Sequence, residues 1–569
     1  MKSMLSPLKK NLKTIILIII LLMLQANFTL SLPEYTAAIV DVGIANADMA
    51  YIYSAGTTMI IFTLLAALCA ILVSFFSNRV ASEYAKDLRK IVFSKVMKFS
   101  NHELNDLSKG SLITRTTNDI THIKTVLGFI LEILIFAPIM AIGGVIKTIQ
   151  LGSQLTWVVV VALILMVVFI SLVMKKVMPY LGKLQETTDN INRIIREMII
   201  GLPVIKSFVR QDYEAKKFKK ANEESRDLKN FTNKYLLSLG PMMTLFLSIM
   251  IVAIVYFGSQ FVAAETMLTG DMLAFIQYAT QIVSSLLMVS ALSTILPELL
   301  VSINRVKEIL DTDVSIVDGE IDSIDEERST LEFRNVSYQY PQSEKDTITN
   351  INFKLEPGKT VAIIGGIGSG KSTILNLIPR LQDPSAGEIL MNGENIKNFK
   401  LKTLRDRICL TPQKAHLFHG TVKSNMTLID ANASDEKIKE ALDKASVNFI
   451  NGLDDEVFQD GSNFSGGQKQ RLSIARSLLK NADFYLFDDC FSALDMNTEK
   501  AIRTNLKELK DSAILIVSQR ISTIKDADEI LVLDNGAIVD RGPHSKLVET
   551  CEIYKEIVKS QGESLGGGK

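Results

Sequence analysis

The sequence has few cysteines and no excess of charge of either sign. Its four cysteines, Cys69, Cys409, Cys490 and Cys551, have neither paired spacing nor the spacing of zinc ligands, so we expect no disulfide framework and no zinc site. The 62 basic residues balance 62 acidic residues, which argues against a general nucleic-acid-binding protein. With 47% hydrophobic residues in 569, the composition also excludes a disordered, collagen-like or small disulfide-stapled chain.

Charged residues are missing from long stretches of the first half of the chain. Five stretches of 20 to 30 residues without Asp, Glu, Lys or Arg, and one further apolar run that carries Glu132, are each long enough to cross a hydrocarbon core of about 30 Å. These six predicted spans lie at residues 14–33, 49–78, 126–146, 148–174, 235–264 and 272–297. The first follows Lys9, Lys10 and Lys13, so a cleaved signal peptide is the alternative, but the five later spans favour a retained anchor.

The positive charge between the spans predicts their orientation. The connector 79–124 holds nine Lys and Arg residues and the connector 175–234 holds fourteen, whereas the connectors 33–49 and 265–271 hold none. Since Lys and Arg stay on the cytoplasmic side, both termini and the two long basic loops are predicted to be cytoplasmic. Their length predicts helices that continue from the spans into the cytosol and return.

The composition changes after the last span. We divide the chain into a membrane domain (1–310), an acidic linker (311–329), a domain of alternating strands and helices (330–562) and a glycine-rich tail (563–569), which we interpret as added by cloning. Short apolar runs at 331–336, 360–364, 484–487, 513–517 and 529–533 are predicted strands, and helices are predicted at 373–377 and 469–479. The second domain is therefore of the α/β class.

A phosphate-binding loop follows the predicted strand 360–364. Glycines allow the loop to wrap a phosphate with its backbone N–H groups, and the helix that follows contributes its N-terminal dipole. Lys371 is predicted to reach the terminal phosphates and Ser372 to ligate Mg²⁺. The full motif is Gly365, Gly366, Ile367, Gly368, Ser369, Gly370, Lys371 and Ser372, and Thr373 begins the helical pattern.

Two further motifs accompany this loop. The apolar strand 484–487 ends in Asp488 and Asp489, and Asp488 is predicted to hold Mg²⁺ through water; a helix cap is the structural alternative. A serine and glycine segment before the predicted helix 469–479 is also compatible with an ordinary N-cap. That segment consists of Ser465, Gly466, Gly467 and Gln468.

Together these motifs resemble the ATP-binding-cassette (ABC) exporters, as a half-transporter with one six-helix membrane domain of the type I exporter fold and one α/β P-loop nucleotide-binding domain. The resemblance covers nearly the whole chain and implies ATP and Mg²⁺ as cofactors. It implies that Tyr340 stacks on adenine and that Gln413 reaches Mg²⁺. It further implies that residues 465–468 bind the γ-phosphate of ATP held by another subunit, and that Asp495, in the segment 492–495, belongs to the nucleotide site.

The chain departs from the family pattern at two catalytic positions. Where the family has a glutamate that activates the attacking water, this chain has Asp489, which is one methylene shorter and should sit back from the water. Where the family has a switch histidine, this chain has Gln519, whose amide does not titrate near pH 7. A softer departure is the segment 459–461, which reads Gln-Asp-Gly where the family usually has Glu-Arg-Gly.

These departures resemble the degenerate-site subunit of heterodimeric bacterial multidrug ABC exporters. The resemblance implies that the chain's own P-loop, Asp489 and Gln519 form a slow site, while its intact 465–468 segment serves the competent site of a second, different half-transporter. It implies a multi-pass protein of the bacterial plasma membrane with a cytoplasmic nucleotide-binding domain, which exports hydrophobic or amphipathic compounds such as drugs, lipids or peptides. A homodimeric exporter with weak ATPase activity and a membrane-tethered nucleotide sensor remain as alternatives.

Two further expectations concern coupling and the substrate path. The resemblance implies short coupling helices within 101–111 and 201–211 that dock on the cassettes, with local packing in the loop bundle as the alternative for the apolar strip 200–208. Glu132 is an acid inside a span, where a carboxylate is expensive and usually faces the bundle interior. A contact with a cation or with substrate and a purely structural role are both open for this residue.

Overall fold

The computed structural model describes residues 2–151, 153–292, 295–324, 329–341 and 343–562. They form two compact units, residues 1–97 with 107–312 and residues 98–106 with 313–569. The short helix α4 (Asn101–Asp106) therefore groups with the nucleotide-binding unit, although it lies within the first 310 residues. The predicted glycine-rich tail, residues 563–569, lies outside the described residues.

The membrane unit consists of helices. Six of them are long and apolar enough to cross a membrane, as predicted. The sixth candidate span covers Thr269–Val289, and residues 293–294 of the predicted run 272–297 lie outside the described residues. The elements are α1 (Lys2–Lys10), α2 (Leu12–Ala38), η1 (Ile39–Ile44), α3 (Met49–Val96), α5 (Lys109–Thr116), α6 (Asn118–Phe129), η2 (Ile130–Leu134), α7 (Ile135–Leu151), α8 (Ser153–Ile200), α9 (Leu202–Ser207), α10 (Gln211–Ala263), α11 (Thr269–Leu292) and α12 (Leu296–Asp311).

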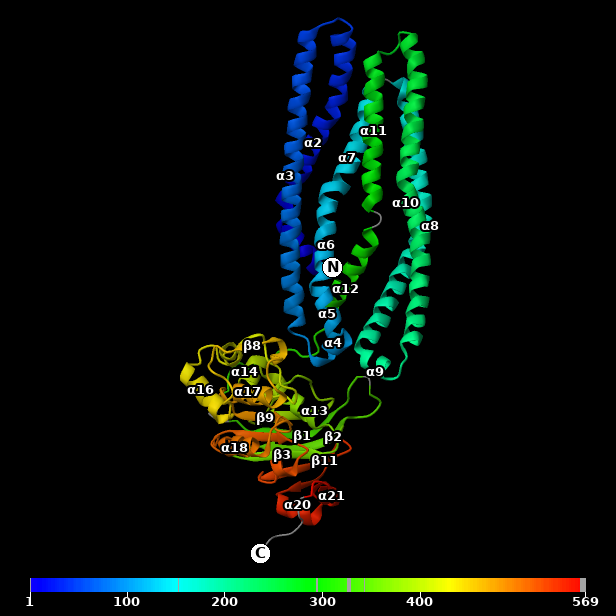
Figure 1. Ribbon diagram of the computed structural model, residues 1–569. Helices are drawn as coiled ribbons and strands as arrows, with labels where there is room; N and C mark the ends of the chain where they lie inside the picture. Colours follow the sequence, from blue (N-terminus) through cyan, green and yellow to red (C-terminus); the bar gives the residue numbers. More distant parts are fainter. Residues whose placement is uncertain (1, 152, 293–294, 325–328, 342, 563–569) are drawn as a thin grey trace. The chain divides into compact units, whose positions relative to one another are not determined.

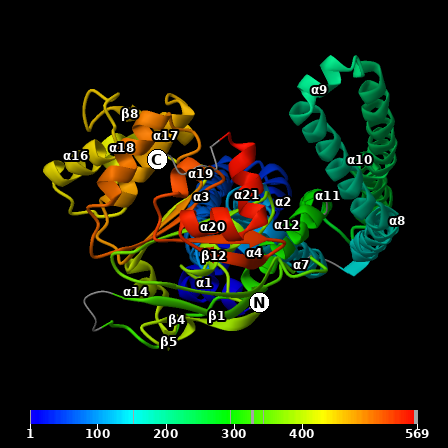
Figure 2. The same ribbon diagram turned by 90° about the horizontal axis from the view of Figure 1, so that it is seen from below.

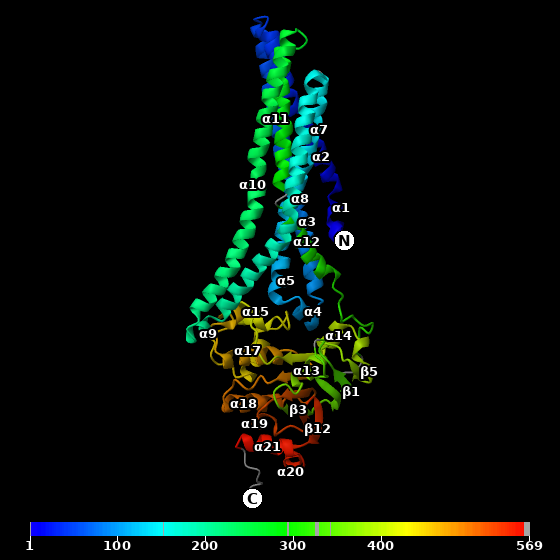
Figure 3. The same ribbon diagram turned by 90° about the vertical axis from the view of Figure 1, so that its right-hand side faces the viewer.

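Neighbouring long helices pair along their length: α2 lies beside α3, α7 beside α11, and α8 beside α10 (Figure 1). Ile18 and Leu22 of α2 are fully buried and pack in one cluster with Val73 and Val80 of α3. The Tyr278 hydroxyl of α11 donates a hydrogen bond to the Leu30 carbonyl across 2.9 Å and ties α11 to α2. Both long basic loops are helical continuations of the spans, and α9 closes the turn between α8 and α10 (Figure 3).

The nucleotide-binding unit is built on a six-stranded sheet in the order β12-β11-β3-β10-β9-β6, in which only β12 is antiparallel to its neighbour. The central strands are buried on both faces, as expected for continuous apolar runs in a parallel sheet. The strands are β3 (Thr360–Gly365), β6 (Ile408–Thr411), β9 (Phe484–Asp488), β10 (Ala513–Val517), β11 (Glu529–Asp534) and β12 (Ala537–Gly542). All five predicted strands of the domain are confirmed, the first as β1 (Leu331–Tyr338).

A second, antiparallel sheet has the order β2-β1-β4-β5, and a small one pairs β7 with β8. Their strands are β2 (Ile348–Leu355), β4 (Ala386–Met391), β5 (Glu394–Asn395), β7 (Gly420–Thr421) and β8 (Glu456–Val457). Figure 2 shows β1, β4 and β5 on one side of the domain and the helices α16, α17 and α18 on another. The helices are α13 (Lys371–Leu377), α14 (Leu401–Asp406), α15 (Val422–Met426), α16 (Asp435–Lys444), α17 (Gly466–Leu478), α18 (Met496–Leu506), α19 (Ile521–Ile524), α20 (His544–Thr550) and α21 (Glu552–Ser560), with 3₁₀ turns η3 (Ile396–Asn398) and η4 (Gln459–Gly461).

Candidate functional site

The carboxyl ends of the parallel strands β3, β9 and β10 open into one cavity of about 270 Å³. In the sheet register, Val517 at the end of β10 lies between Ile363 of β3 and Asp488 of β9, so the loops that follow these strands converge. Ligands in open α/β sheets bind at this edge. The lining residues are Thr347, Ile367, Gly368, Gly370, Lys371, Ser372, Thr373, Gln413, Asp488, Asp489, Val517 and Gln519.

The phosphate-binding loop owes its shape to glycine at positions that other residues cannot occupy. Gly368 and Gly370 have φ angles of 82° and 96°, in the left-handed region. A Cβ atom at Gly370 would also overlap the Ile348 side chain, and one at Gly365 would overlap the Leu533 carbonyl. The loop and the first residues of α13 line the cavity, which places the loop backbone and the helix N-terminus where a phosphate site requires them.

Lys371 holds the same loop together from inside. Its ammonium donates hydrogen bonds to the carbonyls of Gly365 and Gly366 at 2.9 and 2.6 Å and to the Ser369 hydroxyl at 3.3 Å. Burial lowers the pKa of the Lys371 amine, although the nearby carboxylates Asp489 and Asp488 oppose the shift. A phosphate in the cavity would offer this cation a charged acceptor in place of neutral carbonyls.

Ser372, the predicted Mg²⁺ ligand, and Asp488, predicted to hold Mg²⁺ through water, lie together. The Ser372 hydroxyl donates a 3.1 Å hydrogen bond to Asp488 Oδ1, so the start of α13 and the end of β9 present neighbouring oxygens, one suited to direct ligation and one to a Mg²⁺-bound water. Burial raises the pKa of the Asp488 carboxyl, and the adjacent Asp489 adds to the rise while the Ser372 bond opposes it. These oxygens therefore fit a divalent cation that would stabilise the ionised carboxylate.

Asp489 points its carboxylate into the cavity with one oxygen unsatisfied. The residue is 8% exposed, has a left-handed φ of 43°, and its Oδ1 has no hydrogen bond partner among the described residues. Its Oδ2 accepts a long hydrogen bond, 3.5 Å, from the Gln413 amide. Burial raises the pKa of the Asp489 carboxyl, and the Gln519 backbone N–H and the Gln413 amide offset only part of that rise. An unpaired buried oxygen is costly unless a ligand satisfies it.

Gln519 lines the cavity beside Asp489, and Tyr340 lies near its rim. The Tyr340 hydroxyl is 3.3 Å from the Thr373 hydroxyl of α13, and its ring meets Tyr338 edge to face. Tyr340 is half-buried and does not line the cavity itself, so its predicted stacking on adenine stays a prediction.

The segment 465–468 lies outside the cavity. Ser465 caps α17 by accepting a bond from the Gln468 N–H, and the Gln468 side chain accepts one in return from the Ser465 N–H at 2.8 Å. The helix therefore begins at Gly466, three residues before the predicted Lys469, because the capping box extends it through both glycines. Ser465 and Gly466 remain exposed, while Gly467 fits tightly against the Ala493 carbonyl.

Asp495 likewise lies outside the cavity. It caps α18 by accepting a 3.0 Å bond from the Thr498 N–H, which lowers the pKa of its carboxyl. Its capping role is structural, so its predicted membership of the nucleotide site stays a prediction.

Three residues near the cavity carry no sequence signal. Thr347 and Val517 line it, and neither belongs to a recognisable motif. The side-chain amide of Gln470, buried in α17, donates a hydrogen bond to the Gln413 carbonyl. It so connects the helix that begins in the segment 465–468 to the loop that carries Gln413. Only the folded chain, which brings residues 57 positions apart together, reveals this contact.

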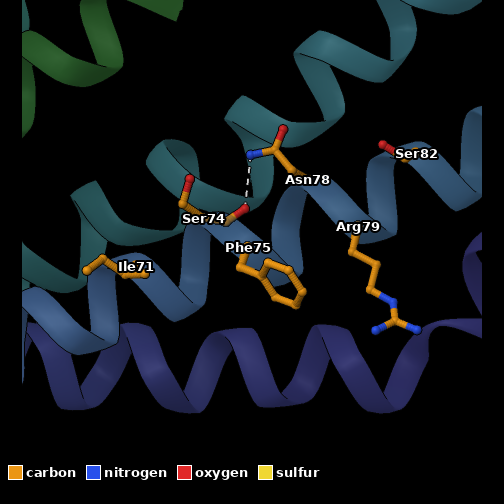
Figure 4. Close-up of a pocket in the computed structure, with 6 residues that line it drawn as sticks. All are labelled: Ile71, Ser74, Phe75, Asn78, Arg79 and Ser82. Carbon is orange, nitrogen blue, oxygen red and sulfur yellow. Dashed lines mark hydrogen bonds between the residues drawn. The ribbon is translucent and has the colours of Figure 1, made fainter.

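A second candidate site is an open hollow of about 750 Å³ along α3 in the membrane unit. Figure 4 shows its six side chains over successive turns of this helix, with Phe75 and Arg79 extending to one side and Asn78 to the other. The Asn78 amide donates to the Ser74 carbonyl at 2.9 Å within α3, and its carbonyl oxygen lies beside Gly128 of α6. The lining residues are Ile71, Ser74, Phe75, Asn78, Arg79 and Ser82, apolar toward one end and polar or basic toward the other.

Both predicted coupling segments contain a short helix, α4 and α9. The apolar side chains at α9 face solvent: Val204 is 59% exposed and Phe208 is 72% exposed. This exposure contradicts local packing of the apolar strip within the loop bundle. In α4, by contrast, the Glu103 carboxylate is buried at 5% exposure and accepts bonds from the backbone N–H groups of Ser100, at 2.6 Å, and Ser315, at 3.0 Å.

Comparison with known proteins agrees with this architecture. Residues 15–286 match the ABC transporter transmembrane region, and residues 348–492 match the ABC transporter nucleotide-binding family. An uncharacterized ABC transporter ATP-binding protein of Mycobacterium tuberculosis is 34% identical over 566 residues, 97% of each chain. The ATP-dependent lipid A-core flippase of Pseudomonas aeruginosa is 30% identical over 519 residues, 90% of this chain and 85% of that protein.

The fold also has a solved counterpart. The structure of a bacterial Atm1-family ABC exporter with ATP bound matches with a TM-score of 0.84 over 98% of this chain and 99% of that one, at 23% sequence identity. At this identity the likeness concerns the fold alone. It confirms the predicted combination of a six-helix exporter membrane domain and an α/β nucleotide-binding domain.

Proposed function

Because this chain belongs to the ABC transporter family, as an exporter half-transporter that joins six spans to one ATP-hydrolysing domain, we propose that it is the degenerate-site subunit of a heterodimeric exporter. In this proposal its own nucleotide cavity, with ATP and Mg²⁺, turns over slowly. Its segment 465–468 completes the competent site of a second, different half-transporter. The single observation that carries the proposal is the pair of side chains at the reacting end of the cavity, Asp489 and Gln519.

Catalysis at this cavity depends on the reach of these two groups. The Asp489 side chain is one methylene shorter than that of glutamate, so its carboxylate reaches less far toward the attacking water. Its Oδ2 also already accepts a hydrogen bond from the Gln413 amide. Gln519 donates and accepts hydrogen bonds but cannot hold a proton near pH 7. Both features support binding of ATP in preference to its hydrolysis.

The exposure of the segment 465–468 supports the proposal that it serves a nucleotide site on another subunit. Ser465 and Gly466 lie at the solvent-exposed start of α17 and make no contribution to the chain's own cavity. A helix N-terminus with free N–H groups is suited to an anion supplied from outside the chain. The exposed apolar residues of α9 are likewise suited to a socket on another nucleotide-binding domain.

For the substrate, we propose an amphipathic compound that binds the hollow along α3. Ile71 and Phe75 offer an apolar surface, while Asn78 and Arg79 offer polar contacts near the cytoplasmic end of the span. Arg79 is paired at 3.3 Å with Glu83, and both side chains are exposed, so this weak ion pair is easily exchanged for an anionic group of a substrate. The relative from Pseudomonas aeruginosa is named for a lipid substrate, which is of the same amphipathic class.

Glu132 is a second proposed contact on the substrate path. It lies in the π-helical turn η2, and π-helical turns are frequent at functional sites. It is half-buried and makes no ion pair within the described part of the chain.

We propose that the protein lies in the bacterial plasma membrane with its nucleotide-binding domain in the cytoplasm, which the basic connectors support.

The decisive experiment is purification of the tagged chain from its native membrane, followed by identification of the co-purifying half-transporter and assay of ATP-driven dye or lipid transport in vesicles. We expect one different ABC half-transporter at equal stoichiometry, transport by the pair, and little ATPase activity of the chain alone. Recovery of two copies of this chain with brisk turnover would identify the homodimeric exporter instead. A nucleotide-sensitive complex that moves no substrate would identify a sensor.

A further inference from the structure

Gln561, the residue that follows the C-terminal helix α21, binds the segment 519–521, which we call the switch segment. The amide of Gln561 donates a 2.7 Å hydrogen bond to the Gln519 carbonyl, and its carbonyl oxygen accepts a 2.9 Å bond from the Ile521 N–H. Ile521 is the first residue of α19, and Arg520 at the N-cap of α19 provides no side-chain cap. Gln561 therefore satisfies a helix N–H that is otherwise without a partner, from 40 residues away.

The helix that precedes Gln561 is anchored in the domain, while Gln561 itself is exposed. Tyr554 and Val558 of α21 are fully buried, and the Tyr554 hydroxyl lies 2.8 Å from Nδ1 of His544 in α20. Gly562 follows with a φ of 70°, which turns the backbone after α21, whose last helical residue is Ser560 and whose C-cap is Gln561. Figures 2 and 3 both show α21 and α19 side by side.

The switch segment is bound from its other side by residues of the nucleotide site. Gln519 lines the nucleotide cavity together with Asp489 and Lys371. The Arg520 guanidinium donates a 2.7 Å bond to the Ser492 carbonyl, in the loop that follows β9 and Asp489. The segment thus lies between the catalytic loop and α21, and only the Gln561 side chain contacts it from α21 among the hydrogen bonds of the described residues.

We propose that Gln561 is a positioning residue for ATP hydrolysis, which fixes the peptide 519–521 so that the Gln519 side chain meets the terminal phosphate beside Asp489. Gln561 touches no nucleotide and is not itself catalytic. Its two hydrogen bonds set the direction of the Gln519 peptide, and a small rotation of that peptide would move the Gln519 amide by more than a hydrogen bond tolerates. The inference holds whether the partner subunit is a second copy or a different chain.

Two substitutions separate this role from simple packing of the helix end. Gln561→Ala removes both hydrogen bonds. Gln561→Glu keeps an acceptor for the Ile521 N–H but places a second oxygen against the Gln519 carbonyl, so only the bond to Gln519 is lost. Lys559→Ala is the matched control, because it removes an exposed side chain of α21, two residues before Gln561, that makes no hydrogen bond or ion pair among the described residues.

The variants are measured in the full-length chain, purified with the subunit it assembles with, whose P-loop lysine is substituted so that only this chain's cavity turns over. The measurements are ATPase kinetics and backbone hydrogen exchange of a peptide that covers 518–524. For Gln561→Ala we expect kcat to fall about 3- to 10-fold with the KM for ATP unchanged within twofold, and exchange at Ile521 to rise by a similar factor, the range that one lost hydrogen bond predicts. Gln561→Glu should lower kcat by a similar factor but leave hydrogen exchange at Ile521 as slow as in the unmodified protein. Lys559→Ala should match the unmodified protein.

Three results would overturn the proposal. The first is an unchanged kcat in Gln561→Ala, and the second is a normal kcat in Gln561→Glu, since that would show the Gln519 bond to be dispensable. The third is faster exchange spread over β10 and the P-loop as well, with a lower melting temperature, which would show that Gln561 serves the packing of the domain and not the position of the switch segment.

Discussion

The Ser372 hydroxyl and the Asp488 carboxylate are joined by a 3.1 Å hydrogen bond that connects the start of α13 to the end of β9. The two residues are 116 positions apart in the chain, and they meet because β3 and β9 run parallel on either side of β10. One bond therefore fixes the P-loop relative to the acidic end of β9. It also brings together the two oxygens best placed to hold Mg²⁺ with the phosphates of ATP.

We expect Asp488→Asn to raise the Mg²⁺ concentration needed for half-maximal nucleotide binding at least about tenfold, because an amide lacks the charge that balances the cation. The measurement is a Mg²⁺ titration of fluorescent ATP analogue binding to the full chain. Asp534→Asn, at the end of strand β11 in the same sheet and outside the cavity, is the control and should behave as the unmodified protein. An unaltered Mg²⁺ requirement in Asp488→Asn would show that the cation is held elsewhere.

The degenerate site predicts a non-additive gain of function. Asp489→Glu alone should raise hydrolysis at this cavity only modestly, by less than about threefold, because Gln519 still cannot hold a proton. Asp489→Glu combined with Gln519→His should raise it by about 100-fold or more, the usual range of general acid-base catalysis. The rates are measured with the partner's P-loop lysine substituted, so that only this cavity turns over. Equal gains from the single and double variants would remove the switch position from the explanation.

Much of the nucleotide-binding domain was predictable, since its physical signals are local. The runs 513–517 and 529–533 are buried on both faces as β10 and within β11, and such strands stand out as uninterrupted apolar segments. The P-loop and the position of Asp488 follow from short motifs. The start of α17 was missed by three residues, because a Ser and Gln capping box outweighed the low helix propensity of Gly466 and Gly467.

Residues that act through distant partners were not predictable. Glu103 bonds to Ser315, 212 positions away, and Gln561 bonds to Gln519, 42 positions away. Neither is part of a local pattern, and a polar residue in a helical segment is usually exposed. The hollow along α3 was missed for a similar reason, because its polar residues are spaced by helical turns within an otherwise apolar span.

The buried Glu103 carboxylate predicts a pH-dependent loss of stability. Burial opposes its ionisation, but the hydrogen bonds from Ser100 and Ser315 outweigh burial and lower the pKa to about 2 from an ordinary value of 4.5. A carboxyl with a lowered pKa in the folded state stabilises the protein above pH 4.5, and this contribution is lost as the pH falls from about 4.5 towards 2. Glu103→Gln should therefore lower the free energy of unfolding at pH 7 by about 1–3 kcal/mol, with a smaller difference near pH 3.

Glu356 is the matched control for Glu103. The pKa of its carboxyl is also lowered to about 2, through Lys359 and Lys354, but the residue is exposed to solvent. Thermal unfolding of Glu356→Gln should show a small loss that about 0.5 M salt abolishes. The loss in Glu103→Gln should persist in salt, because the Glu103 carboxylate is buried and its partners are neutral serines. Equal salt sensitivity of the two variants would contradict the buried network.

The exposed apolar residues of α9 predict a loss of coupling without a loss of folding. Phe208→Asp places a charge where we propose that another nucleotide-binding domain provides an apolar socket, so stimulation of the ATPase by substrate should fall at least about tenfold while ATP affinity stays the same. Because Phe208 is 72% exposed, the melting temperature of the isolated chain should not change. Lys206→Asp, at an exposed position of α9, introduces the same carboxylate beside the apolar strip and should reduce stimulation far less. If both variants reduced it equally, the surface would act through charge and the apolar strip would have no docking role.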